Sequence, residues 1–148
     1  MAKRILVPLD ATDDMEAVLD LIADAARGGG ATVRLLRVAP HAETVRDLDG
    51  HVVVYADQES ARLEAEADDY LARVATRFAG VDVERAVRFG EPVPEILLEA
   101  EAFGAELIAM TARRSHTLTR LVLGTTTDQI CRRSDVPVVI YRQAPIRV

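Results

Sequence analysis

The chain has one cysteine and one lysine among its 148 residues, and each scarcity excludes a class of protein. Cys131 has no second cysteine to pair with, so an internal disulfide is excluded and a reducing compartment, the cytoplasm, is expected. Lys3 precedes the first apolar run, so no lysine follows a glycine-rich loop. P-loop NTPases, which place such a lysine on their phosphates, are therefore excluded.

Three other motifs of nucleotide, acyl or phosphoryl chemistry are also missing. No strand pattern is followed by GxGxxG, which disfavours a dinucleotide-binding fold, and no GxSxG marks a hydrolase nucleophile. A phosphate-accepting receiver domain needs an aspartate after its third strand and a lysine after its fifth. Arg88-Phe-Gly90 and Arg142-Gln143 stand at those places, so this class is disfavoured too.

Excess positive charge and long apolar runs are lacking as well. The net charge of −6 disfavours sequence-independent binding to nucleic acid, which requires a basic face. The apolar run at the N-terminus is broken by Pro8 and ends at Asp10, which is too short for a signal peptide or a membrane span. We therefore expect neither a nucleic acid nor a membrane as partner.

What the sequence contains is an alternation of short apolar runs and segments of helical period. With 49% hydrophobic residues, the chain has the size of one domain with one core, residues 1–148. Strands are expected at residues 4–9, 32–38, 81–89, 106–110 and 136–142. Helices are expected around residues 15–26, 63–78, 93–100 and 125–133, and Gly28-Gly-Gly30 predicts the end of the first helix. This pattern predicts a doubly wound α/β fold, a parallel sheet with helices on both faces.

Residues Ala39–Asp57 interrupt this rhythm with charges, Gly50 and a short valine run, and they predict a mobile, irregular loop. A long connection of this kind serves a function or reflects tolerance of an insertion, and both interpretations stay open. His41 and His51 lie in this segment without a second ligand at metal spacing. We interpret them as solvated side chains and predict no metal site.

Ligands of a doubly wound sheet bind where two neighbouring strands separate at their carboxyl ends. If the first and fourth strands flank that crevice, one side of the lining comes from Pro8 to Thr12, with Asp10 and Ala11 among them, and the other side comes from residues 110–114. Asp10 then accepts hydrogen bonds from a ribose or a base. The alternative is that Asp10 or Thr12 caps the first helix.

A helix start follows the fourth strand and combines features for and against phosphate binding. Gly124 and Thr125 open a helix whose first amides have no intrahelical partner and whose dipole is positive at that end. The turn after the strand reads Thr111-Ala112-Arg113-Arg114, where a backbone that approaches a phosphate closely requires glycine. These two arginines and Arg120 either hold a smaller or differently placed anion or are solvated loop charges.

Four segments resemble the universal stress protein family, and the resemblance extends over essentially the whole chain. They are Ile5-Leu-Val-Pro-Leu-Asp-Ala-Thr12, Leu35-Leu-Arg-Val38, Gly90-Glu-Pro92 and Pro137-Val-Val-Ile140. The resemblance implies a five-stranded parallel sheet in the order 3-2-1-4-5 and a two-fold dimer through the last strand. The family divides into members that bind ATP and members that do not.

In the family that this chain resembles, the ATP-binding members contain the sequence pattern G-x2-G-x9-G-[ST]. In this sequence the first two glycines are replaced by Thr111 and Arg114, whereas the final pair, Gly124 and Thr125, is retained. The resemblance therefore implies that the register of the phosphate segment is kept but two of its glycines are lost.

Other positions of the family's site carry over one by one. By this resemblance Asp10 meets the nucleoside. The positions that wall the base match Pro8, Val38 and Met110. The positions that meet the phosphates match Thr125, Thr126 and Thr127. The implied site has an intact ribose and base half beside an altered phosphate half.

Two functional hypotheses follow. We expect a non-enzymatic, dimeric stress-response protein that requires no cofactor and binds ATP weakly if at all, because a Cβ at each former glycine position occupies space near the phosphates. The alternative is a nucleotide-dependent switch or a slow ATPase. The sequence offers little evidence for catalysis, because no general base is paired with a nucleophile and His116 is isolated. We interpret Cys131 as a small core residue on the helix face of Thr127 and Ile130.

The last strand pattern, Val136–Arg142, predicts self-association. Its residues are apolar on both faces, yet the strand is expected at a sheet edge, where an exposed run of this kind invites pairing. Val81-Asp-Val-Glu84, expected at the opposite edge, alternates as a solvated edge does. A homodimer through the last strand is therefore expected, with a nucleotide or small anion as the other partner.

Overall fold

The computed structural model describes residues 3–10, 16–112 and 124–142. Within them no helix is long and apolar enough to cross a membrane. The elements follow in the order β1 (Arg4–Pro8), α1 (Glu16–Gly29), β2 (Thr32–Ala39), β3 (Val45–Arg46), β4 (Val52–Val54), α2 (Ala56–Ala75), a 3-10 turn (Thr76–Phe78), β5 (Asp82–Phe89), α3 (Pro92–Phe103), β6 (Leu107–Ala112), α4 (Thr125–Arg133) and β7 (Val138–Arg142).

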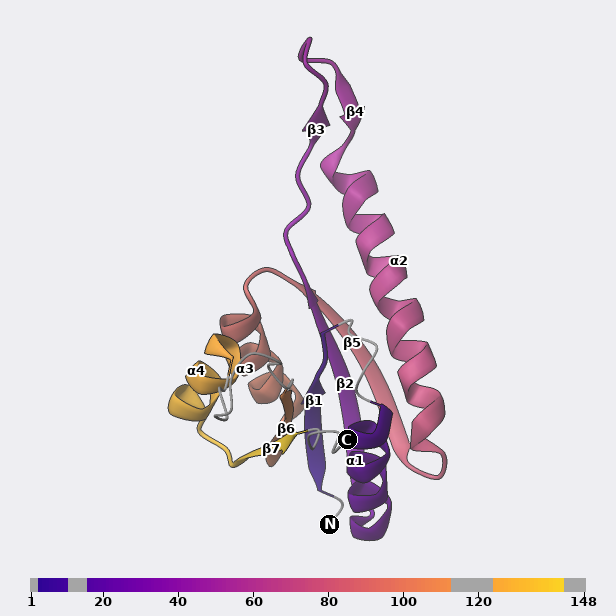
Figure 1. The fold of residues 1–148 in the computed structure, drawn as a ribbon, viewed down its shortest axis with the longest axis vertical. Helices are drawn as coiled ribbons and strands as arrows, with labels where there is room; N and C mark the ends of the chain where they lie inside the picture. The colour runs from indigo at the N-terminus through magenta and orange to yellow at the C-terminus, as the bar shows by residue number, and fades with distance from the viewer. Residues whose placement is uncertain (1–2, 11–15, 113–123, 143–148) are drawn as a thin grey trace, which may run out of the picture.

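Five of these strands form one sheet in the order β5-β2-β1-β6-β7, and every neighbouring pair is parallel (Figure 1). Counted along the chain without the short strands β3 and β4, this is the order 3-2-1-4-5. The predicted doubly wound α/β fold and its strand order are therefore confirmed.

The sheet separates two apolar cores. Val7 and Leu35 pack in the core beneath α1 and α2, whereas Leu6 and Leu36 pack in the core beneath α3 and α4. All four side chains are 0% exposed, and burial of each stabilises the fold by about 1.5–3 kcal/mol. Because neighbouring residues enter opposite cores, β1 and β2 each carry consecutive apolar residues, Leu6-Val7 and Leu35-Leu36, which is the pattern that predicted them.

Glycine and proline set the ends of the helices. Pro92 occupies the first turn of α3, where its missing N–H has no intrahelical acceptor to lose. α3 ends at Gly104, whose φ of 68° lies in the left-handed region that glycine adopts without strain. Gly30, with a φ of 63°, follows α1, so the predicted helix stop at Gly28-Gly-Gly30 is confirmed.

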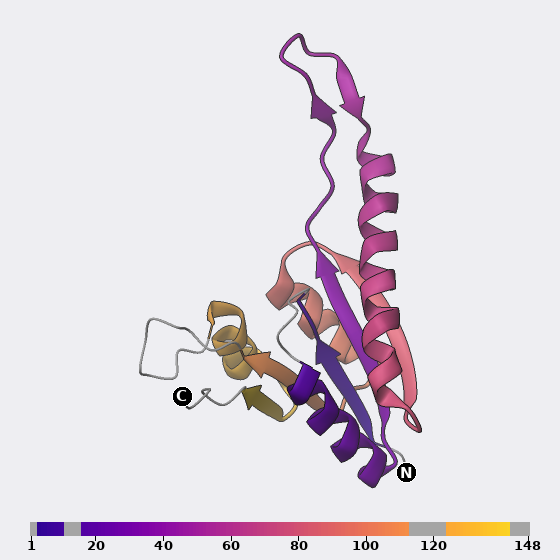
Figure 2. The same cartoon turned by 45° about the vertical axis from the view of Figure 1, so that its right-hand side comes forward.

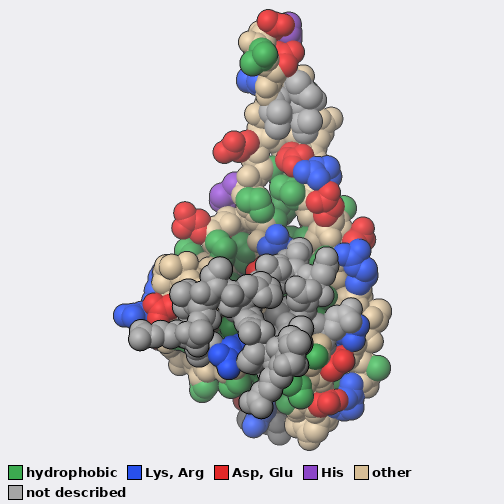
Figure 3. Space-filling view, in the orientation of Figure 1, with side chains coloured by type: hydrophobic (Ala, Val, Ile, Leu, Met, Phe, Trp, Pro, Cys, Tyr) green, Lys and Arg blue, Asp and Glu red, His purple; other side chains and the backbone are tan. Residues whose placement is uncertain are grey.

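The segment predicted as an irregular loop, Ala39–Asp57, contains an antiparallel hairpin of β3 and β4, so that prediction is wrong. A carboxylate of Asp47 closes the hairpin turn, since its Oδ1 accepts hydrogen bonds from the amides of Asp49 and His51 at 3.0 and 2.8 Å. Figures 1 and 2 show the hairpin and the first half of α2 extending beyond the sheet. Acidic side chains and a histidine gather at the far end of this arm (Figure 3).

A cluster of charges fastens α3 to the edge of the sheet. Glu99 of α3 is 6% exposed and accepts hydrogen bonds from Arg34 of β2 at 2.7 Å and Arg88 of β5 at 2.5 Å. Arg34 also donates a hydrogen bond to Glu84, and Arg88 also donates one to Glu95. Burial raises the pKa of Glu99, but the hydrogen bonds from Arg88 and Arg34 outweigh burial and leave that pKa below its ordinary value of 4.5.

Candidate functional site

A crevice opens at the carboxyl ends of β1, β2 and β6. The ladder between β1 and β6 runs from Ile5 and Leu107 to Leu6 and Ile108, after which the two strands separate. β2 lies on the other side of β1, so this is the point at which the strand order reverses and ligands of doubly wound sheets bind. The crevice has a volume of about 170 Å³, and α3 and the start of α4 complete its walls.

Most of the described site residues predicted from the sequence come together here. The crevice is lined by Pro8, Asp10, Val38, Met110, Thr111, Thr126 and Thr127. Gly124 and Thr125 are exposed at the start of α4 and do not line it. The predicted residues Ala11, Arg113 and Arg114, with Thr12 and Arg120, lie outside the described residues.

The start of α4 contributes Thr126 and Thr127 to the lining of the crevice. Gly124 precedes the helix in an extended conformation, and its carbonyl accepts the first intrahelical bond, from the amide of Asp128 at 3.0 Å. The amides of Thr125–Thr127 therefore have no acceptor within the helix, and the helix dipole is positive there. Thr126 is half-buried and Thr127 is buried, which fixes both residues against the crevice wall.

Asp10 lies at the mouth of the crevice, directly beyond β1. The hydroxyl of Tyr70 in α2 donates a hydrogen bond to the backbone carbonyl of Asp10 at 2.9 Å, so α2 positions the end of β1. Asp10 is exposed and lines the crevice. The alternative role as a helix cap involves residues 11–15, which lie outside the described residues.

Several lining residues were missed from the sequence. They are Leu36, Arg37, Pro92 and Ile96. Three of these are apolar and form walls between the sheet and α3. Arg37 is different because it brings a positive charge to the end of β2, and its position beside Val38 was the signal that could have found it.

A larger groove of about 640 Å³ lies beside the second half of α3. It is bordered by Gly104, Ala105 and the segment from Ser134 to Val136, which precede β6 and β7. The groove is therefore at the amino ends of the strands, whereas ligands of this fold class bind at the carboxyl ends. The smaller crevice is the better candidate site.

The prediction that Cys131 is a small core residue is wrong, because this thiol is exposed. Thr127 and Ile130 are buried, and Cys131 is turned from Ile130 by about 100° around the helix axis. The sulfur also lies outside the lining of the crevice.

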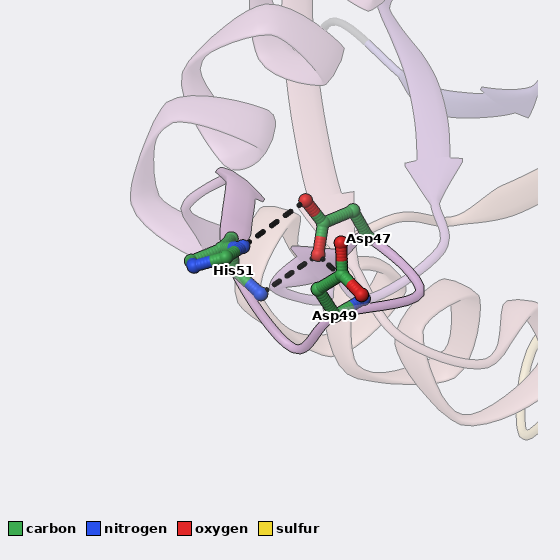
Figure 4. Close-up of side chains that lie close together, drawn as sticks. All are labelled: Asp47, Asp49 and His51. Carbon is green, nitrogen blue, oxygen red and sulfur yellow. Dashed lines mark hydrogen bonds and ion pairs between the residues drawn. The ribbon is translucent and has the colours of Figure 1, made fainter.

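His51 has carboxylates beside it, which the sequence analysis did not anticipate. One ligand atom from each of Asp47, Asp49 and His51 lies within 4.8 Å of the others (Figure 4). All three residues are exposed, and Asp47 already closes the hairpin turn while its other oxygen lies 3.5 Å from Nδ1 of His51. The grouping is explained by the turn, so the interpretation of His51 as a solvated side chain is retained.

An open parallel sheet with a crevice at its switch point, bordered by a carboxylate and a helix start, defines a doubly wound α/β domain with its crevice at the position where ligands of this fold class bind. The model of the Universal stress protein family matches residues 1–142, and the chain belongs to this family.

Individual relatives agree with this assignment. The universal stress protein YxiE of Bacillus subtilis is 29% identical, over 96% of this chain and 100% of the relative. The solved structure of UspA from Lactobacillus plantarum has a TM-score of 0.71 at 23% identity, over 95% of this chain and 97% of that one. A universal stress protein from Archaeoglobus fulgidus, solved in complex with dAMP, has a TM-score of 0.63 at 20% identity, over 93% and 96%. Another universal stress protein was solved in complex with cAMP and has a TM-score of 0.63 at 18% identity, over 97% and 98%.

Proposed function

We propose that this protein is a non-enzymatic, homodimeric, cytoplasmic protein of the stress response that holds a nucleoside or a small nucleotide in its crevice and binds ATP weakly at best. The observation that carries the proposal is the crevice itself, with Asp10 at the end of β1 and Thr126 and Thr127 at the start of α4. Relatives solved with dAMP and cAMP support a nucleotide of modest size.

Weak ATP binding follows from the residues around the phosphate end. Thr111 lines the crevice at a position where ATP-binding relatives are expected to have glycine. The second replaced glycine, Arg114, lies outside the described residues. Each lost charge-assisted phosphate contact costs about 1.5–3 kcal/mol, so two losses reduce affinity by roughly 10²- to 10⁴-fold.

The absence of catalysis is proposed from the chemistry of the lining. Among the described lining residues there is neither a histidine nor a cysteine, and Asp10 is the one carboxylate. Acyl or phosphoryl transfer by side chains requires a base paired with a nucleophile or a preorganised charge clamp. A nucleotide-dependent switch or a slow ATPase is the alternative outcome of the test below.

Calorimetry with ATP, adenosine and inorganic phosphate tests the crevice. We expect Asp10→Ala to weaken adenosine binding, whereas Asp24→Ala, which removes an exposed carboxylate of α1, leaves it unchanged. We expect Thr111→Gly combined with Arg114→Gly to strengthen ATP binding, because the space for phosphate is restored. Micromolar or tighter ATP binding by the unmodified protein, abolished by Asp10→Ala, would establish the nucleotide switch instead.

The dimer is proposed through β7. This strand pairs with β6 on one side, and no strand of the described residues pairs with its other side. Val139 is 39% exposed, so an apolar side chain lies on an edge that natural proteins usually cover or charge.

Light scattering and sedimentation test this interface at micromolar concentration. We expect a dimer that Val139→Asp dissociates. The control Leu48→Asp places a charge at the exposed tip of the hairpin, and it should leave the dimer intact. A monomeric unmodified protein would refute the interface.

A further inference from the structure

Arg37 brings a positive charge to the carboxyl end of β2. Arg37 is half-buried, and it lines both the crevice and a second cavity of about 100 Å³ between β2 and α2. Its Nη1 donates a hydrogen bond to the carbonyl oxygen of Val38 at 2.9 Å, which holds the guanidinium at the end of the strand. Among the residues that the structure describes, Arg37 forms no ion pair.

Two neighbouring arginines of the sheet, in contrast, form ion pairs. Arg34 of the same strand pairs with Glu99, and Arg85 of β5 pairs with Asp68. Glu66 lines the small cavity beside Arg37, but its carboxylate is paired with Arg62. A guanidinium has five N–H donors and no acceptor, so Arg37 retains donors for an acceptor that the described protein residues do not supply.

The position of Arg37 determines which part of a nucleotide it would meet. β2 and β6 lie on opposite sides of β1, and α4 lies on the β6 side (Figure 1). A phosphate is favoured at the start of α4, where amides are unpaired and the dipole is positive. The base of the same nucleotide then lies toward β2, beside Val38 and Arg37.

We propose that Arg37 makes the crevice selective for purines with a carbonyl at ring position 6, hypoxanthine and guanine, over adenine. The carbonyl O6 and the ring N7 both accept hydrogen bonds, and an arginine fork matches this pair. Adenine presents an amino group at position 6, which is itself a donor and opposes the donor-only guanidinium. This inference rests on the proposed function, since it requires the crevice to hold a nucleoside moiety.

IMP and AMP provide the test because they carry the same ribose and phosphate and differ at the 6-position edge of the base. Calorimetry on the full-length unmodified protein should show IMP binding about 10- to 100-fold more tightly than AMP, the value of one charge-assisted hydrogen bond. Arg37→Met should reduce this ratio to within about 3-fold, because methionine keeps the length of the side chain without its donors. Arg73→Met is the matched control, since it removes an exposed arginine of α2 outside the crevice, and it should keep the full ratio.

The outcomes separate the two proposals. If both nucleotides bind and Arg37→Met leaves the ratio unchanged, or if the unmodified protein prefers AMP, the role of Arg37 is refuted while the proposed nucleotide crevice stands. If neither nucleotide binds, the proposed function is refuted and the selectivity with it. Arg37→Lys guards against misfolding of the methionine variant, because an ammonium also donates to O6 and N7 and has no acceptor. A preference for IMP that is kept in the lysine variant and lost in the methionine variant supports the proposal, whereas equal ratios in these two variants refute it.

Discussion

Replacing Glu99 by glutamine removes the charge that two arginines share at the junction of α3 and the sheet. Arg34 and Arg88 each donate a hydrogen bond to a different oxygen of this buried carboxylate. Glutamine keeps the shape of the side chain, but it offers one acceptor oxygen instead of two and no negative charge. The substitution therefore tests how far this cluster stabilises the wall of the crevice.

The loss of stability in Glu99→Gln depends on which carboxylate partners Arg34 and Arg88 keep in this variant. A hydrogen bond to a charged group contributes about 1.5–3 kcal/mol, and breaking a buried ion pair costs about 3–5 kcal/mol. Arg34 keeps Glu84 and Arg88 keeps Glu95, so neither guanidinium is left without a carboxylate. We expect Glu99→Gln to lower the free energy of unfolding by about 2–4 kcal/mol, which for a chain of this size lowers the Tm by about 4–16 °C.

Urea unfolding followed by circular dichroism measures this difference directly. Glu66→Gln is the matched control, because the Glu66 side chain is 61% exposed and pairs with Arg62 at the surface. We expect the control to change the free energy of unfolding by at most about 1 kcal/mol. Equal losses in the two variants, or a loss below about 1 kcal/mol for Glu99→Gln, would show that the buried cluster does not stabilise the fold.

Three further predictions concern stability. The pKa of Glu99 lies below 4.5 in the folded protein, so the stabilisation by its carboxylate is complete above pH 4.5 and is lost as the pH falls through the folded pKa. The difference in free energy of unfolding between the unmodified protein and Glu99→Gln should therefore disappear on acidification. A difference that is independent of pH down to acid denaturation would contradict this. Gly104→Ala should destabilise by about 1–2 kcal/mol because φ is 68°, whereas Gly28→Ala inside α1 should be neutral or stabilising in the same urea titration. Tyr70→Phe removes the hydrogen bond to the Asp10 carbonyl and should cost about 0.5–1.5 kcal/mol in thermal unfolding; an unchanged Tm would mean that this bond does not hold the crevice mouth.

Local sequence patterns were sufficient to predict the helices and strands whose stability depends on burial and capping. α4 spans Thr125–Arg133 as expected, because Gly124 and the threonines begin the helix and the pattern ends before Pro137. The crevice could also be placed, since the end of β1 and the start of α4 are both recognisable and the fold class brings them together.

Local sequence patterns could not predict features that depend on the direction of a side chain or on contacts between residues far apart in the chain. Arg34 and Glu99 are 65 residues apart, so their ion pair requires the packed α3. The hairpin turn is closed in part by the side chain of Asp47, whose two amide contacts are not visible as a sequence pattern. Cys131 differs from Ile130 by one helical step, which is enough to move it from the core to the surface, and Arg37 bends over the end of a strand where alternation no longer predicts its neighbours.

The most direct test of the central claim is to locate the bound nucleoside by NMR titration of the isotopically labelled protein. With AMP or IMP, we expect saturable amide shifts at the carboxyl ends of β1, β2 and β6 and in the first turn of α4, with Asp10, Val38 and Thr127 among them. Saturable shifts gathered instead around Leu98 and Glu101 in the larger groove beside α3, or no saturable shifts at all, would contradict it.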